Sequence, residues 1–243
     1  PARRARGLDD PGDRPPRTPS PSAWEALLPA LRRHRLRPLA GWAARTRRAE
    51  MPERIRGELD GAYFGAGLRY EALRRALTQI ADACAALRGP VIVLKGPALA
   101  APCYPSPACR PMEDVDLLVE AADRPAATRA LLALGYTDRS FGPEDFRHPA
   151  TGIVVDLHTE LLNTTRLPLR RAAWQPQLAR WTARSIPLPL AEPLRGLHPQ
   201  DHLVYLCHHA WLHHGLRKPL ALLDIALLLA APEVSRLGKA WLR

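Results

Sequence analysis

The chain has 243 residues, of which 47% are hydrophobic, so it is long enough to bury a substantial core. No apolar run reaches the roughly 18 to 20 residues of a membrane-spanning helix, and the first residues lack a signal peptide's apolar stretch; we therefore expect a cytoplasmic protein with no membrane partner. The net charge of +11 is weak evidence for a nucleic-acid partner, because only three of the 35 basic residues are lysines (Lys95, Lys218 and Lys239) and arginine is frequent throughout.

The first part of the chain is predicted to be a tail followed by helices. Residues 1–22 are rich in Pro, Arg, Asp and Ser and have little to bury, which predicts disorder. Residues 23–89 form a predicted helical region, in which Ser22 is the expected N-cap of the first helix. A long amphipathic segment begins near Leu68 and is expected to end at Gly89. The arginines of LRRHRLR are interpreted as a solvated helix face.

Residues 90–170 show a different period, with short apolar runs between turn residues. The runs VIVL, VDLLVE and GIVVDLHTEL predict strands, and one short helix is expected to begin at Pro97. A second helix is expected after an N-cap at Asp123. The segments YTDRSF and 146–148 predict a hairpin or an edge pair. This region is therefore predicted to be the core of the fold.

Residues 171–243 return to a helical pattern, with long segments beginning near Pro199 and Pro219. The fold class that follows is α+β, a small mixed β-sheet flanked by N-terminal and C-terminal helical regions. The first residue is not Met and KAWLR ends within a helical pattern, which predicts a piece of a longer chain.

Carboxylates in the predicted strands are the main chemical signal. Asp114 and Asp116 lie two residues apart, so they point to the same face of a strand and repel each other unless a cation lies between them. Mg²⁺, which prefers oxygen ligands, is the obvious cation, although both aspartates are equally consistent with a solvated strand start. Asp156 lies within a third apolar strand, where a charge is costly unless it is paired or binds a metal.

The VIVLKG junction is the second signal. Gly96 permits close approach of the backbone, the helix that follows presents free N–H groups, and Lys95 adds a positive charge. Such a turn suits a phosphate, and together with three nearby aspartates it predicts a site for a metal and a triphosphate.

An ordered set of residues carries a resemblance to a known family. The set consists of Lys95, Gly96, Tyr104, Arg110, Asp114 and Asp116, followed by Val155-Asp156-Leu157-His158. It resembles the bacterial family of largely uncharacterised nucleotidyltransferases, a branch of the DNA polymerase β-type superfamily. The resemblance covers about residues 67–230 if helices with His209 and Asp224 are included. It departs from the wider superfamily, whose turn has Gly-Ser or Gly-Gly closer to the D-x-D pair.

The resemblance implies transfer of a nucleoside monophosphate from an NTP, most simply ATP, to an acceptor hydroxyl, with release of pyrophosphate. Asp114 and Asp116 would bind two Mg²⁺ ions, and Asp156 would complete the second site or take the acceptor's proton. Lys95 and Gly96 would hold the β- and γ-phosphates.

For the remaining residues each implied role has an alternative. Arg110 would stabilise the phosphates or pair with the acidic cluster to hold its loop. His158 would orient a carboxylate, contact substrate or simply pack in the core. His209 would line the cleft or pack, and Tyr104 would stack on a base or anchor a turn.

Two further functions fit the sequence. One is a binding protein that keeps the fold without catalysis, and the other is an RNA-binding or RNA-modifying module that uses the basic N-terminal region. The acceptor is not encoded in any motif: a small molecule, a peptide, a protein side chain and an RNA end all fit.

Overall fold

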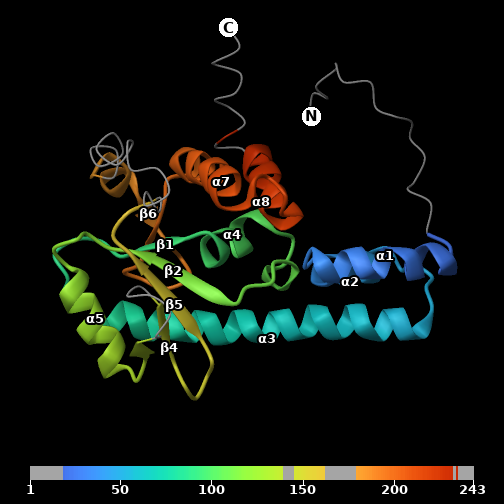
Figure 1. The fold of residues 1–243 in the computed structure, drawn as a ribbon, viewed down its shortest axis with the longest axis horizontal. Helices are drawn as coiled ribbons and strands as arrows, with labels where there is room; N and C mark the ends of the chain where they lie inside the picture. Colours follow the sequence, from blue (N-terminus) through green and yellow to red (C-terminus); the bar gives the residue numbers. More distant parts are fainter. Residues whose placement is uncertain (1–18, 139–144, 162–178, 232–233, 235–243) are drawn as a thin grey trace, which may run out of the picture.

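The computed structural model describes residues 19–138, 145–161, 179–231 and 234. The predicted α+β class is confirmed: a mixed sheet lies between helices (Figure 1). The helices are α1 (Pro21–Arg33), α2 (Arg37–Thr46), α3 (Glu53–Ala83), α4 (Gly96–Cys103), α5 (Arg124–Ala133), α7 (Pro199–His214) and α8 (Pro219–Ala230), with a 3-10 turn η1 (Pro107–Cys109). The strands are β1 (Ile92–Leu94), β2 (Asp114–Leu118), β3 (Thr137–Asp138), β4 (Asp145–Arg147), β5 (Val154–His158), β6 (Ile186–Pro187) and β7 (Arg195–Gly196).

Over the described ranges the seven strands have the order β3-β4-β5-β2-β1-β7-β6. At the centre, β2 runs parallel to β5 and antiparallel to β1. The predicted strands at 91–94, 115–120 and 152–161 are therefore present as β1, β2 and β5, the three central strands. The predicted edge pair is also present as β3 and β4, while residues 139–144 of that segment lie outside the described residues.

The two faces of the sheet are covered by different helices. Side chains that alternate along each strand send Val93, Val115 and Val155 to one face, where they form a single apolar core with residues of α3 and α5. The opposite face carries Leu94 and Leu118, which pack with residues of α4, α7 and α8. Figure 1 shows α3 below the sheet and α4, α7 and α8 above it.

Helix α3 joins the sheet to the N-terminal helices. Ile55 and Leu59, near its start, are fully buried against α1 and α2. Leu77 and Ile80, near its end, are fully buried against the sheet. This 31-residue helix is long enough to pack on both partners. It therefore holds the α1–α2 pair beside the sheet, as Figure 1 shows.

The ends of the N-terminal helices differ from the prediction. The N-cap of α1 is Ser20, whose hydroxyl oxygen accepts from the Ala23 amide at 3.2 Å, so the prediction of Ser22 was wrong. The proline at position 21 explains the shift, because proline is favoured in the first helical turn. The predicted disorder of residues 1–18 lies outside the described residues.

The prediction that the long helix ends at Gly89 was also wrong, because α3 ends at Ala83. Asp123 is the N-cap residue of α5, as predicted, but its carboxylate makes no capping hydrogen bond. It accepts instead from the amides of Arg88 and Gly89, at 3.3 and 2.7 Å. The turn into β1 is thereby bonded to the start of α5.

The C-terminal region is not helical throughout, contrary to the prediction. Its strand β7 pairs in parallel with β1, and β6 pairs with β7, so the sheet continues beyond residue 170. The expected helices near Pro199 and Pro219 are present as α7 and α8. Among the described residues, no helix is both long enough and apolar enough to cross a membrane.

Candidate active site

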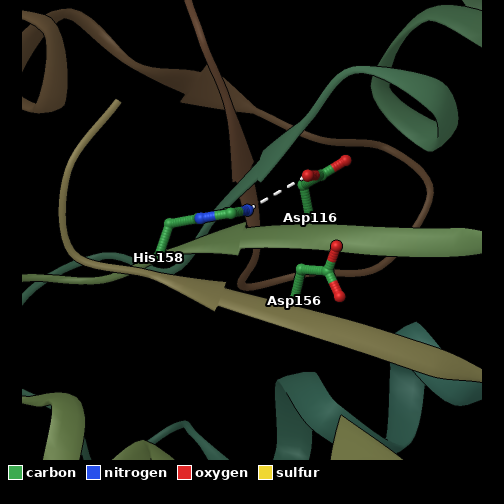
Figure 2. A group of neighbouring side chains, drawn as sticks. All are labelled: Asp116, Asp156 and His158. Carbon is green, nitrogen blue, oxygen red and sulfur yellow. Dashed lines mark hydrogen bonds and ion pairs between the residues drawn. The ribbon is translucent and has the colours of Figure 1, made fainter. Parts of the chain in front are cut away.

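The site lies on the sheet face that α7 and α8 cover. Strands β2 and β5 are in parallel register, with Asp116 opposite Asp156 and Leu118 opposite His158. Figure 2 shows Asp116, Asp156 and His158 side by side on these two strands. The apolar residues between them point the other way, into the core on α3. The two-residue period thus places the polar groups together on one face of the sheet.

The side chains of Asp116, Asp156 and His158 are close enough to one another to bind a single cation. One ligand atom each from Asp116, Asp156 and His158 lies within 4.8 Å of the others. His158 Nε2 also lies 3.1 Å from Asp116 Oδ1. From the sequence, His158 was expected to orient a carboxylate, contact substrate or pack in the core; in the structure its imidazole contacts Asp116 and belongs to the three-residue group. Asp114 is not part of this group, but it lines the same cavity as Asp116 at its exposed end.

Asp156 has an unusual environment for a carboxylate. Its Oδ1 is buried and has no hydrogen-bond partner among the described residues. Partial burial, followed by the charges of Asp116, Asp145 and Asp114, raises the Asp156 pKa to about 7. An unpaired carboxylate oxygen beside a second carboxylate and an imidazole fits a divalent cation, which satisfies the oxygen and offsets the repulsion.

Lys95 bonds directly to this cluster. Its Nζ lies 2.6 Å from Asp116 Oδ1. Burial opposes ionisation of Asp116, but the hydrogen bond with His158 and the positive charge of Lys95 outweigh it and hold the Asp116 pKa below its usual range. Lys95 itself has a φ of +49° and a ψ of −122°, a conformation that is costly for any residue except glycine.

Gly96 is needed for close packing within the site. A Cβ atom at this position would lie 2.7 Å from Arg110 Nη1 and 2.9 Å from Met112 Cγ, which is too close for either contact. The sequence assigned Gly96 to phosphate binding through the backbone, and that role stays a prediction. The structure adds a second reason for glycine, which is the approach of the Arg110 side chain.

Arg110 pairs with an aspartate far away in the sequence. Its Nε and Nη2 donate to Oδ1 and Oδ2 of Asp224 at 2.9 and 2.7 Å, and the Tyr104 hydroxyl donates to the same Oδ1 at 2.6 Å. All three residues are buried. The pair ties the loop before β2 to α8. Arg110 thus bonds to an acid outside the D-x-D cluster, Tyr104 anchors its turn, and a phosphate contact of Arg110 stays a prediction.

A cavity of about 360 Å³ opens beside the carboxylates. Its walls come from β2, the loop before it, α7, α8 and the turn between α1 and α2. The basic and imidazole residues that line it are Arg33, His34, Arg35, Lys95, Arg110, His209, His214 and Lys218.

The sequence did not assign the α1–α2 turn to the site, because its arginines looked like a solvated face. The only signal was the density of basic residues in LRRHRLR.

His209 lines this cavity from α7. Its ring stacks on that of His213, with 4.5 Å between the centroids. Burial, the nearby Lys95 charge and the two neighbouring histidines lower the His209 pKa to about 3, so its imidazole is neutral near pH 7. His209 therefore both lines the cleft and packs, which were the two predicted alternatives.

Comparison with known proteins gives one match. The model of a family described as "Uncharacterised nucleotidyltransferase" matches residues 20–237. The matched range begins just before α1 and continues past α8, so it includes every residue of the cluster and cavity described above. Neither the curated proteins nor the solved structures gave a match.

Proposed function

This chain belongs to the uncharacterised nucleotidyltransferase family, and from that premise we propose that it transfers a nucleoside monophosphate from an NTP to an acceptor hydroxyl. ATP is the first nucleotide to test. The observation that carries the proposal is the parallel register of β2 and β5. It places Asp156, whose Oδ1 has no partner among the described residues, opposite Asp116, which lines the cavity.

Two Mg²⁺ ions, when bound, would neutralise the phosphates and lower the pKa of the acceptor hydroxyl. Asp116 and Asp156 would hold them, with Asp114 as a further oxygen ligand at the cavity mouth. His158 would orient Asp116 through its 3.1 Å contact with Oδ1. This assignment keeps an all-oxygen ligand set, which Mg²⁺ prefers, and gives the imidazole a positioning role.

In the reaction, the acceptor oxygen would attack the α-phosphorus, and the bond to the β-phosphate oxygen would break as pyrophosphate leaves. Receiving the acceptor's proton is the alternative role for Asp156 to completing the second metal site, because its Oδ1 has no partner among the described residues. Lys95, Gly96 and Arg110 are proposed to hold the phosphates. Arg110 would act mainly by fixing the loop before β2, since Asp224 already occupies two of its donors.

The acceptor remains open among a small molecule, a peptide, a protein side chain and an RNA end. A cytoplasmic location also stays a prediction. A binding protein without catalysis is the second candidate function, and the transfer assay distinguishes it, since a cation would offset the crowded carboxylates in either case.

The test is transfer of radiolabel to an acceptor in fractionated cell extract. With α-³²P-labelled ATP and Mg²⁺, we expect label to enter one fraction and pyrophosphate to appear in equal amount. With γ-³²P-labelled ATP no fraction should gain label above that of the extract without this protein, and Asp116→Asn should abolish transfer. Label from the γ position would contradict nucleotidyl transfer and indicate phosphoryl transfer instead.

A further inference from the structure

Lys95 is held against the metal cluster by the turn that carries it. Its ammonium lies 2.6 Å from Asp116 Oδ1, and its side chain is only 21% exposed. The backbone at Lys95 has a positive φ of +49°, which persists in folded proteins only where the surroundings enforce it. The start of α4 therefore fixes where the lysine stem begins, close to Asp116.

The ammonium and a divalent ion would compete for the same carboxylate. Asp116 Oδ1 already has Lys95 Nζ and His158 Nε2 within bonding distance. Asp116 is also the buried member of the three-residue group that can hold a metal. Two like charges at such short range repel each other, and the repulsion is strong where the shared carboxylate is buried, as Asp116 is. Binding of the metal should therefore weaken the bond between Lys95 and Asp116.

The buried ion pair that ties α8 to the loop before β2 uses an arginine, whereas the ion pair in the metal cluster uses a lysine. Arg110 holds Asp224 through two parallel bonds, whereas Asp116 is paired with one of only three lysines among 35 basic residues. An ammonium on a flexible four-carbon stem bonds as a point charge and can swing to a new partner, unlike a planar guanidinium. The Lys95 ammonium can move into the cavity beside Asp116, because Lys95 is one of the residues that line this cavity.

We propose that Lys95 is a metal-responsive phosphate ligand: its ammonium neutralises Asp116 until a divalent metal binds there, and the metal then displaces it onto the phosphates of the nucleotide. This inference rests on the proposed function. It gives the site an order of assembly, in which metal binding creates the phosphate-binding cation. It also makes metal and nucleotide binding cooperative, because each favours the same position of Lys95.

The test is a pair of titrations on Lys95→Met, which keeps an unbranched side chain only one atom shorter and removes its charge. Free Mn²⁺ is followed by electron paramagnetic resonance without nucleotide, and ATP binding is measured by calorimetry at saturating Mn²⁺. Removing the competing charge should tighten Mn²⁺ binding about tenfold, while ATP binding should weaken about tenfold. The effects have opposite signs because the ammonium opposes one ligand and attracts the other.

Lys218→Met is the matched control, because Lys218 lines the same cavity but is exposed and comes from the turn before α8. It should leave Mn²⁺ affinity unchanged. Lys95→Gly is a second variant for the case that Lys95→Met folds poorly, because glycine tolerates the positive φ. It should show the same tighter Mn²⁺ binding and weaker ATP binding. Melting temperatures identify which variants are folded.

The outcomes separate the two claims. If wild type binds Mn²⁺ and ATP but the Lys95 variants do not gain Mn²⁺ affinity, the displacement of Lys95 is wrong while the site stands. A loss of affinity for both ligands would also overturn it, since that result indicates a purely structural lysine. If wild type binds neither ligand, the proposed function fails as well.

Discussion

The two faces of the central sheet differ sharply, although the same strands supply both. On the α3 side, Val115, Leu117 and Val155 are almost completely buried in one apolar core. On the α7 side, the alternating positions carry Asp116 and Asp156, and Asp116 lines the cavity. The α3 face of these strands is therefore purely apolar, whereas the α7 face combines carboxylates with its own apolar cluster, so changes on the α3 face should affect stability and spare ligand binding.

The largest loss of stability is expected when the ion pair between Arg110 and Asp224, which ties the loop before β2 to α8, is broken. Asp224→Ala leaves the buried Arg110 guanidinium without its partner, so it should lower the free energy of unfolding by about 3–5 kcal/mol. Urea denaturation measures this. The double variant Arg110→Met/Asp224→Leu should be clearly more stable than Asp224→Ala, because neither charge is left alone. A cost below about 1 kcal/mol for the single variant would mean that the pair does not hold α8.

Leu117→Ala tests the opposite face. Leu117 is 1% exposed, so its truncation should lower the free energy of unfolding by about 2–5 kcal/mol. Because its side chain points away from the carboxylates, ATP affinity of the folded protein should change by less than about twofold. Calorimetry well below the melting temperature measures that affinity. A large loss of binding with intact folding would show that the two faces are coupled.

The pH dependence of stability should report on His202, a buried residue of α7. Burial, with the charge of Arg110, lowers the His202 pKa from 6.5 to about 3. Below pH 6.5 His202 is protonated in the unfolded chain, whereas in the folded protein it stays neutral until about pH 3. The free energy of unfolding therefore falls as the pH falls from 6.5 to 3.

His202→Met should remove this contribution, so wild type minus variant should have a slope of at most about 1.4 kcal/mol per pH unit. Urea denaturation from pH 7 to pH 4 measures the difference. Equal pH dependence in both proteins would show that His202 is not kept neutral by burial.

The smallest effect is expected at the cavity rim. Arg35 pairs with Glu113 at 3.1 Å, but both side chains are largely exposed. Arg35→Ala should therefore change the free energy of unfolding by less than about 1 kcal/mol. A shift in melting temperature of only a few degrees would agree, whereas a large shift would show that the α1–α2 turn depends on this pair.

The sequence predicted the parts of the fold that depend on neighbouring residues. Strands β1, β2 and β5 are apolar runs with clear boundaries, and the spacing of Asp114 and Asp116 sets the face on which they lie. Strands β6 and β7 were missed because each has only two residues, too few for a period to show. Strand β7 pairs with β1, which is about 100 residues earlier in the sequence, and β6 pairs only with β7 among the described strands.

The site, like the fold, was predictable where it depends on residues close in sequence and not where it depends on long-range contacts. The aspartates could be found from their spacing, but nothing near Arg110 indicates that its partner is Asp224, 114 residues away. The nearness of His158 to Asp116 depends on which strand pairs with β2 and in which register. The arginines of the α1–α2 turn reach the cavity only because α3 holds that turn beside the sheet. Such contacts come from tertiary packing rather than local pattern.

The most direct test of the account is calorimetric titration of ATP with and without Mg²⁺ on wild type and Asp116→Asn. Asp138→Asn, the same change on the exposed edge strand β3, is the matched control. We predict Mg²⁺-dependent binding to wild type and to Asp138→Asn, and a loss of about a hundredfold or more in affinity for Asp116→Asn. Equal binding by all three folded proteins, or binding that ignores Mg²⁺, would contradict a metal and nucleotide site at Asp116.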